Sequence, residues 1–389
     1  MGIGVLPVED EVYSEPAGGR VTARLEQARS EERAGEARAV RPGFASGQRP
    51  HGPRTPRRNG AAYAALDLGT NNCRLLVAEP APYAFRVLDA FSRIVRLGEG
   101  LGTSNRLGEA AIARTMEALR ICRAKMDARG VRRARLVATE ACRLAENGPE
   151  FVARVRKELG LELEVVDRRS EAYLAVTGCA ALADPKAQSV IIFDIGGGSS
   201  EIAWLDGRAA SPLQDPTKRI RAWDSLPVGV VTLAERHGGY EVTRAVFETM
   251  VEEVSALLAS FELAAGAAAL SPGFHLLGTS GTVTTIGGVF LRLPRYDRRR
   301  VDGLWMSEAE ITGVIDELVA TPYSERAANA CIGRDRADLV LAGCAILEAI
   351  RRAFPSQRLR IADRGLREGI LMNLMREDGV WRRGGHRER

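Results

Sequence analysis

The chain has few of the residues from which metal centres and disulfide scaffolds are built. Its 389 residues include four histidines and six cysteines, no two histidines share metal-ligand spacing, and no Cys-x-x-Cys pair occurs. The sequence therefore indicates neither a zinc ribbon nor a disulfide framework. The absence of paired cysteines favours a reducing compartment, and we predict a cytoplasmic protein.

Aromatic residues and long apolar runs are also scarce. Aromatic residues make up 5% of the chain, and no run of 18 apolar residues occurs. Proteins that hold single-stranded nucleic acid stack its bases on aromatic side chains, so we interpret the net charge of +5 as favouring a small or polymeric anion and no specific nucleic acid. The first residues lead into acidic residues and not into the apolar core of a signal peptide, and we expect no membrane association.

Two common phosphate-binding motifs, GxGxxG and GxxxxGK[ST], are missing, but another glycine-bearing pattern occurs twice. Asp67–Asn72 (DLGTNN) follows the apolar run Tyr63–Leu66, and Asp194–Glu201 (DIGGGSSE) follows Ser189–Phe193. Both runs are too short for helices and apolar enough for buried strands. A second apolar run follows each segment, which predicts that each loop lies at the tip of a β-hairpin and does not open a helix.

The repeated loop suits an anion for a physical reason. Glycine permits turns with positive φ and lets backbone N–H groups approach a phosphate without a Cβ in the way. The side chains of Thr70, Asn71, Ser199 and Ser200 add donors, and the aspartates can hold a cation. One such turn is usually a plain β-turn. Its recurrence about one domain length later indicates two similar phosphate-holding lobes with a cleft between them.

At this point the chain resembles a known superfamily. The two loops and the segment Leu277–Thr284 (LGTSGTVT) are similar to the three nucleotide-site motifs of the acetate and sugar kinase, heat-shock chaperone and actin superfamily. Within it, the chain resembles the exopolyphosphatase / guanosine pentaphosphate phosphohydrolase family. The supporting segments are Ala138–Arg143, Ser170–Leu174, Arg336–Asp338 and Ala362–Gly369, in the family's order. The scarcity of histidine argues against the histidine–aspartate phosphohydrolase domain that longer members carry.

The resemblance implies an α/β fold of two actin-like (ribonuclease H-like) lobes with a phosphate-binding cleft between them. We expect lobe I at 61–187 and lobe II at 188–378, with a closing helix at about 365–377 that packs back on lobe I. Residues 1–60 carry six prolines, mixed charges and little apolar surface, so we predict a disordered tail. We expect residues 379–389 to be frayed.

Periodicity predicts several elements between these ends. Lobe I is expected to hold three strands, a helix over 108–129, a strand over 131–138, a helix over 149–160, a strand over 161–166, and a helix that is capped by Ser170 and carries Glu171. Lobe II is expected to hold helices near 241–262, 307–320 and 336–353 and a strand over 358–361. The cluster Arg298–Arg300 is most simply a solvated loop.

The resemblance also implies roles for individual residues. Glu171 stands where the water-activating carboxylate is expected, Glu201 is its partner, and Arg143 matches the arginine that grips the phosphate. Asp194 and Glu201 are the expected ligands of Mg²⁺ or another divalent cation, with Asp67 near the metal. The expected phosphate- and substrate-binding residues are Asp67, Gly69, Thr70, Asn71 and Asn72, then Gly196, Gly197, Gly198, Ser199 and Ser200, and finally Gly278, Thr279, Ser280 and Gly281.

Each of these roles has an ordinary alternative. Glu171 could be a carboxylate favoured by a helix N-terminus, Arg143 an exposed helix arginine, and Gly278–Gly281 a structural turn. The sequence also departs from the family pattern, because Asn72 stands where serine is common and Ser170 where a second glutamate is common. Glu171 is then the single candidate base at this place.

Three functions follow as hypotheses. The first is a metal-dependent exopolyphosphatase that removes terminal phosphates from inorganic polyphosphate. The second uses the same site to hydrolyse the 5′-terminal phosphate of guanosine pentaphosphate. The third is a non-catalytic actin-like nucleotide-binding regulator, which Glu171 disfavours because binding alone needs no base. Dimers are common in the family, so the resemblance allows a homodimer.

Overall fold

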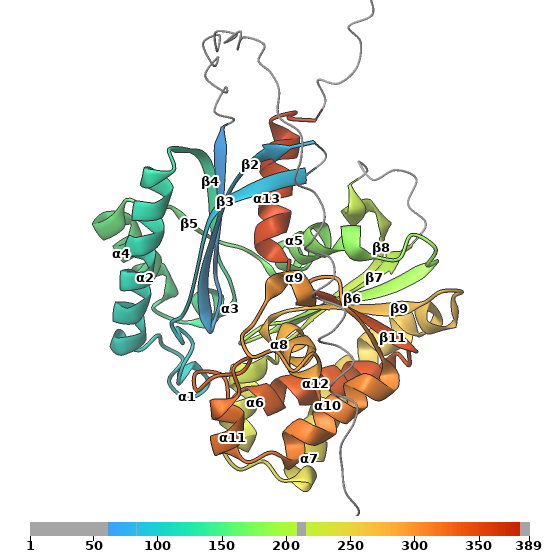
Figure 1. Ribbon diagram of the computed structural model, residues 1–389. Helices are drawn as coiled ribbons and strands as arrows, with labels where there is room; N and C mark the ends of the chain where they lie inside the picture. Colours follow the sequence, from blue (N-terminus) through green and yellow to red (C-terminus); the bar gives the residue numbers. More distant parts are fainter. Residues whose placement is uncertain (1–60, 83, 208–214, 382–389) are drawn as a thin grey trace, which may run out of the picture. The chain divides into compact units, whose positions relative to one another are not determined.

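The computed structural model describes residues 61–82, 84–207 and 215–381, and it contains two mixed β-sheets (Figure 1). The predicted tail at 1–60 and residues 382–389 lie outside these ranges. The first sheet has the order β3-β2-β1-β4-β5 and the second has the order β10-β11-β9-β6-β7-β8. We call the first sheet and the helices packed on it lobe I, and the second sheet and its helices lobe II.

Lobe I is formed mainly by the first part of the described chain. Its strands are β1 (Ala62–Leu68), β2 (Asn72–Ala81), β3 (Ala84–Ile94), β4 (Val131–Ala138) and β5 (Leu163–Val165). Its helices are α1 (Leu101–Ser104), α2 (Glu109–Ala128), α3 (Glu140–Leu144), α4 (Gly148–Leu159) and α5 (Arg168–Cys179), followed by the 3₁₀ turn η1 (Ala180–Leu182).

Lobe II follows, and the last helix of the chain returns to lobe I. The strands are β6 (Ser189–Ile195), β7 (Ser200–Asp206), β8 (Ile220–Leu226), β9 (His275–Thr279), β10 (Trp305–Ser307) and β11 (Arg358–Ala362). The helices are α6 (Val230–His237), α7 (Arg244–Ala265), α8 (Gly281–Phe290), α9 (Arg298–Val301), α10 (Glu308–Ala320), α11 (Tyr323–Ala328), α12 (Val340–Ala353) and α13 (Leu366–Glu377), with 3₁₀ turns η2 (Pro216–Arg219) and η3 (Gly266–Leu270).

The two sheets repeat one arrangement. In the first sheet β1 pairs antiparallel with β2 and parallel with β4, and β2 pairs antiparallel with β3. In the second sheet β6 pairs antiparallel with β7 and parallel with β9, and β7 pairs antiparallel with β8. The glycine-bearing loops join β1 to β2 and β6 to β7, so both predicted hairpins are confirmed. The predicted fold class, α/β with two actin-like lobes, is confirmed too.

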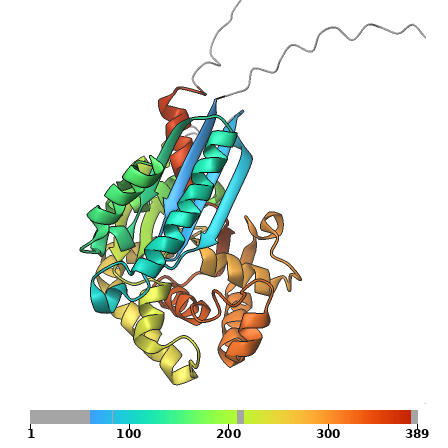
Figure 2. The ribbon, with the colours of Figure 1, turned by 90° about the vertical axis from the view of Figure 1, so that its left-hand side faces the viewer.

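Helices cover both faces of the sheet of lobe I. Successive side chains of β1 point to opposite faces, so they pack in two different clusters. Leu66 and Leu68 pack in the cluster that contains Leu119 of α2. Tyr63 and Ala65 pack in a different cluster, with the apolar face of α13. Figure 2 shows α2 in front of the strands of this sheet and α13 behind them. The last helix of the chain therefore completes the core of lobe I.

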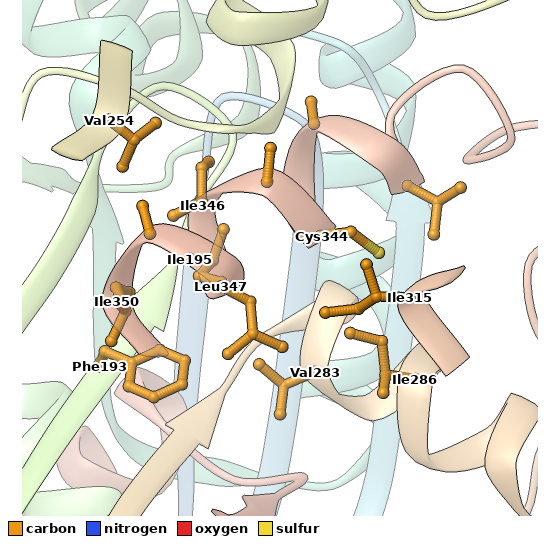
Figure 3. Packing of buried hydrophobic residues seen from close by; sticks show 14 of the residues in the cluster. Phe193, Ile195, Val254, Val283, Ile286, Ile315, Cys344, Ile346, Leu347 and Ile350 are labelled. Carbon is orange, nitrogen blue, oxygen red and sulfur yellow. The ribbon is translucent and has the colours of Figure 1, made fainter. Parts of the chain in front are cut away.

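The core of lobe II is built around α12. Ile346 and Leu347 of this helix pack with Phe193 of β6 and Val283 of α8 (Figure 3). On another side the same cluster takes up the inner face of α7, including Val254. Among the described residues, the stretch Arg244–Leu270 of α7 and η3 is the one helix long and apolar enough to cross a membrane by length and composition. One face of this helix, with Phe247, Met250 and Val254, packs in the cluster.

The two helices that connect the lobes touch through their backbones. A Cβ on Gly178 of α5 would lie 1.9 Å from the carbonyl oxygen of Gly365, and one on Gly369 of α13 would lie 2.1 Å from that of Leu174. Glycine is needed at both places because no side chain fits between the backbones. This close crossing joins lobe I to lobe II.

Several expectations about elements need correction. The N-cap of α5 is Asp167, whose Oδ1 accepts the backbone N–H of Ser170 at 2.7 Å, so Ser170 lies inside the helix and is not its cap. The helix expected from residue 336 begins at Val340. Arg298–Arg300 form the short helix α9 and not a loop. The guanidinium of Arg298 pairs with Glu368 at 3.0 Å, whereas Arg299 and Arg300 are exposed, as expected. The lobe boundary between residues 187 and 188 stays a prediction.

Candidate functional site

A cleft cavity lies between the two hairpin loops. Its lining residues are Asp67, Gly69, Thr70, Asn71, Asn72, Arg74, Thr139, Glu140, Glu171, Asp194, Ile195, Gly196, Gly197, Gly198, Ser199, Glu201, Val230, Ser280, Gly281, Thr282, Thr285, Arg336, Leu339, Val340 and Leu366. Most of the residues predicted from the sequence are among them. The structure thus brings the three motifs, which are far apart in the chain, into one site.

The two loops approach each other as closely as their backbones allow. A Cβ on Gly197 would lie 2.9 Å from Cβ of Thr70 and 3.1 Å from the backbone nitrogen of Asn71. A Cβ on Gly198 would lie 2.8 Å from Oγ1 of Thr70 and 3.2 Å from Cγ of Glu140. These two glycines are therefore required by the contact between the lobes. That close approach brings the N–H groups of both loops to the same small space.

Strand register places an acidic pair at the base of the second loop. Asp194 and Glu201 stand directly opposite each other on β6 and β7. Burial, followed by repulsion from Asp67, raises the pKa of Asp194 to about 6, and burial together with Asp194 raises the pKa of Glu201 to about 7. Oε1 of Glu201 accepts hydrogen bonds from Ser199 Oγ at 2.8 Å and Ser225 Oγ at 2.9 Å. Its Oε2 has no such bond among the described residues.

Glu171 lies on the first turn of α5 and is 9% exposed. Its Oε2 accepts a hydrogen bond from Nη2 of Arg143 at 3.1 Å. Burial, and then repulsion from Glu201, raises the pKa of Glu171 well above its ordinary value, although Arg143 partly offsets this. A buried carboxylate with a raised pKa is a stronger base than an exposed one.

Arg143 lies behind Glu171 and not in the cleft cavity. Its guanidinium pairs with Glu140 and Glu171 and donates to the carbonyl oxygen of Val166. It lines a separate surface hollow beside α4. The prediction that Arg143 grips a phosphate directly has no support in this geometry, because its guanidinium contacts Glu140, Glu171 and the carbonyl oxygen of Val166.

Three other predicted binding residues also point away from the cleft cavity. The Oγ of Ser200 donates to the carbonyl oxygen of Val228 at 2.8 Å. Gly278 faces the ring of Phe193, to which a Cβ would come within 2.5 Å. The Oγ1 of Thr279 donates to the carbonyl oxygen of Arg364 at 2.7 Å. Ser200, Gly278 and Thr279 thus support the loops from behind, although Thr279 lines an adjoining cavity.

Five arginines border the adjoining cavity: Arg298 and Arg364 are held in ion pairs, and the part of the other three in the site was not predicted. Arg74 and Arg336 line both cavities, and Arg367 lines the adjoining one. Within the described part of the chain none of the three guanidiniums makes a hydrogen bond or an ion pair. A Cβ on Gly281 would lie 3.8 Å from both Arg74 Nη2 and Arg336 Nη1, so two of these guanidiniums meet at this glycine.

Carboxylates lie near these arginines without forming an ion pair with them: Glu368 and Asp67 act on Arg367, and Asp363 acts on Arg336. Burial, and then the neighbouring Arg74, lowers the pKa of Arg336, and burial lowers the pKa of Arg367, which also lies near Arg74. Arginine stays protonated even so. The sequence contained a signal for Arg74. It takes the same place in the first hairpin, opposite Asp67, that Glu201 takes in the second hairpin, opposite Asp194. Neighbouring half-buried cations of this kind are expected to bind an anion with several charges.

The residues of the cleft cavity are suited to a divalent cation. No group of three or more histidine, cysteine, aspartate or glutamate side chains in metal-binding geometry occurs among the described residues. However, Asn71 Oδ1 and Asn72 Oδ1 are buried without a hydrogen-bond partner, and Asp194 and Glu201 repel each other. Oxygen atoms of this kind are the ligands that Mg²⁺ prefers, and a cation would relieve the repulsion.

Comparison with solved structures supports this architecture. The Ppx/GppA family member of Aquifex aeolicus is 28% identical, with a TM-score of 0.66 over 82% of this chain and 98% of that one. An exopolyphosphatase from Cytophaga hutchinsonii is 24% identical, with a TM-score of 0.72 over 82% of this chain and 98% of that one. The second likeness shows the fold alone.

Sequence comparison gives the family. The guanosine-5′-triphosphate,3′-diphosphate pyrophosphatase of Aeromonas hydrophila is 28% identical over 321 residues, and that of Aeromonas salmonicida is 26% identical over 318 residues. Each alignment covers 82% of this chain, and the chain spans 60% of the length of these curated relatives. The model of the Ppx/GppA phosphatase family matches residues 76–378. The chain therefore belongs to the Ppx/GppA phosphatase family.

Proposed function

We propose that the protein is an exopolyphosphatase, which hydrolyses the terminal phosphoanhydride bond of inorganic polyphosphate. The observation that carries this proposal is the group of unpaired arginines, Arg74, Arg336 and Arg367, next to the phosphate loops and on the same site as Glu171. A single phosphate would fill the space between the loops and leave these cations unpaired. A chain of phosphates would give each of them an anionic partner.

The proposed reaction is the attack of water on the terminal phosphorus. Glu171 takes a proton from the water, an oxygen–phosphorus bond forms, the bridging phosphorus–oxygen bond breaks, and phosphate and a chain shorter by one unit result. Arg143 holds one carboxylate oxygen of Glu171 so that the other can accept the proton. The N–H groups of the loops at Thr70–Asn72 and Gly196–Ser199 stabilise the charge on the phosphoryl oxygens.

A divalent cation would add further charge neutralisation at the same place. We propose that Asp194 and Oε2 of Glu201 hold Mg²⁺ or another divalent cation, with Asp67 beside it. The bound cation would withdraw charge from the phosphoryl oxygens. Its affinity should rise with pH, because both Asp194 and Glu201 have raised pKa values and must be deprotonated to bind it.

Guanosine pentaphosphate is the second candidate substrate. The curated relatives from Aeromonas carry this type of activity in their names. In this chain the wall formed by Thr282, Leu339 and Val340 gives the cleft cavity a partly apolar side that could seat a nucleoside.

A non-catalytic regulator remains the alternative of another class. In each case we place the protein in the cytoplasm, with lobes at 61–187 and 188–378, and we expect no specific nucleic acid or membrane partner.

The test is phosphate release from long-chain polyphosphate and, separately, from guanosine pentaphosphate, with Mg²⁺. We expect wild type to release phosphate and Glu171→Gln to lose about 10²- to 10⁴-fold in kcat, because the substitution removes the base. Glu146→Gln is the matched control, since Glu146 is a glutamate of the same lobe that forms an exposed ion pair with Arg106. A preference for guanosine pentaphosphate would favour the second candidate. Retained activity in Glu171→Gln would refute the assigned base, and no release from either substrate would leave the regulator.

A further inference from the structure

An arginine of lobe I reaches across the cleft to lobe II. Nη1 of Arg96 lies 3.0 Å from Oδ2 of Asp338, and its Nη2 lies 3.1 Å from Oδ1 of the same carboxylate. The Nη2 also donates to the carbonyl oxygen of Asp335 at 3.2 Å. Asp338 is 8% exposed. A bidentate, half-buried ion pair of this kind stabilises a structure more than an exposed surface ion pair does.

On the lobe I side, the contact is fixed to the first phosphate loop. The backbone N–H groups of Val95 and Arg96 both donate to the carbonyl oxygen of Asn71, at 2.9 and 3.0 Å. The N–H of Gly98 donates to the carbonyl oxygen of Thr70 at 2.9 Å. A displacement of Arg96 would therefore move Thr70 and Asn71, which line the cleft cavity.

On the lobe II side, Asp338 belongs to the turn that supplies Arg336 to the cleft cavity. Arg326, which is 2% exposed, holds this turn by donating to the carbonyl oxygens of Ala337 at 3.4 Å and Gly239 at 3.2 Å. A Cβ on Gly239 would lie 2.0 Å from the carbonyl oxygen of Asp338, so the turn has no room to shift in that direction. Asp338 is thus a rigid anchor next to a residue of the site.

The backbone of Arg96 gives a separate indication that its side chain matters. Its φ is +47°, in the left-handed region where glycine is favoured and a side chain is strained. A glycine or asparagine would fit this turn with less strain. The guanidinium contact across the cleft is the compensating interaction that the structure shows at this position.

We propose that Arg96 and Asp338 are a positioning pair that holds the two lobes closed and fixes the distance between the Thr70–Asn71 loop and Arg336. The lobes are joined covalently and by packing at α5 and α13, and this pair joins them again across the cleft. A second cross-contact, from the N–H of Gly100 to Oε1 of Glu235 at 2.9 Å, lies near it. The kinetic consequence of closure rests on the proposed hydrolase function, whereas closure itself does not.

The first test measures closure without any substrate. Double electron–electron resonance between two spin labels reports the distance between the lobes. The labels are attached at Ala113→Cys on α2 and Glu262→Cys on α7, two exposed positions. In the protein with Arg96 intact we expect a narrow distribution of distances. In Arg96→Gly we expect a broader distribution centred at a longer distance. Glycine adopts φ +47° readily, so this substitution preserves the turn. Asp338→Asn should give the same change in the distance distribution. Arg106→Gly is the control and should give no change, because Arg106 is an arginine of the same lobe whose ion pairs are with the exposed Glu146 and Glu150. Identical distributions in all variants would overturn the proposal.

The second test uses kinetics with tripolyphosphate. Arg96→Gly should raise KM about tenfold and change kcat less than about threefold, because binding must then supply the closure that the pair supplies in wild type. Arg96→Lys keeps the charge but not the bidentate contact, so its KM should lie between those of wild type and Arg96→Gly. An equal loss of kcat and kcat/KM would refute a positioning role. A shifted distance distribution in a protein that hydrolyses no phosphate would reject the proposed function and retain the pair.

Discussion

At the scale of single residues, His275 shows how burial, more than any neighbouring charge, decides a charge state. It lies at the start of β9, fully buried, with its ring 5.1 Å from that of Trp305 in an edge-on contact. Burial lowers the pKa of His275 to about 4. The folded protein therefore holds this histidine neutral, while the unfolded chain binds a proton below about pH 6.5.

This difference predicts a loss of stability in acid. Because the unfolded state binds more protons than the folded state between pH 6.5 and 4, the contribution is complete above pH 6.5 and decreases as the pH falls to about 4. The free energy of unfolding should fall by up to about 3 kcal/mol over this range. Urea unfolding at several pH values would measure it. His275→Phe should flatten this part of the pH profile, and an unchanged profile in that variant would contradict the argument.

The three unpaired arginines give a second prediction at this scale. Each should form a charge-assisted hydrogen bond with a phosphate chain, so Arg74→Gln, Arg336→Gln and Arg367→Gln should each weaken tripolyphosphate binding about 10- to 100-fold. Calorimetry in a Glu171→Gln background avoids hydrolysis. Arg129→Gln, which removes an exposed ion pair with Asp89, is the control. Equal affinity in all variants would place the substrate elsewhere.

At the scale of elements, the crossing of α5 and α13 depends on the absence of side chains. Gly178→Ala would bring a methyl group to 1.9 Å from the carbonyl oxygen of Gly365. We expect a loss of about 1–3 kcal/mol in the free energy of unfolding, because the two backbones must separate. Gly313→Ala on α10, where a Cβ meets nothing within 4 Å, should instead stabilise by about 0.5–1 kcal/mol. Denaturant unfolding of both variants compares them, and equal stability would argue against the tight crossing.

The sequence predicted the elements whose signals are local. Both hairpins were found because glycine-rich loops separate short apolar runs, and α2, α7 and α10 because their apolar residues recur with helical period. The helix α8 was not predicted, since Gly281–Phe290 is rich in threonine, valine and glycine, which have low helix propensity. Its burial in the core of lobe II overrides that propensity.

The site was predictable to the same extent. Glycines and carboxylates identified the two loops, because those residues are adjacent in sequence to the turns that need them, whereas Glu171 was assigned from the family resemblance and its role stays a prediction. The position of Arg143 behind Glu171, and the pairing of Arg96 with Asp338, depend on contacts between residues 28 and 242 positions apart. No local pattern encodes such distances.

At the scale of the whole molecule, lobe I depends on the last helix. The side chains of Tyr63, Ala65 and Leu76 share a buried cluster with Ile370 and Leu374 of α13. A fragment of residues 61–187 would expose this face of the sheet. We expect it to aggregate or remain unfolded, whereas the same fragment with the α13 sequence joined by a flexible linker should be soluble and cooperative in thermal unfolding. Independent folding of 61–187 alone would show that α13 is dispensable for lobe I.

The return of α13 also has a consequence for the order of events during synthesis. The strands of lobe II come from one continuous stretch, 189–362, whereas those of lobe I wait for a helix that leaves the ribosome after all of them. Domains generally fold as units as they emerge. Lobe I, whose strands precede those of lobe II in the chain, should therefore be completed after them, and its open sheet face is what a chaperone would meet on the nascent chain.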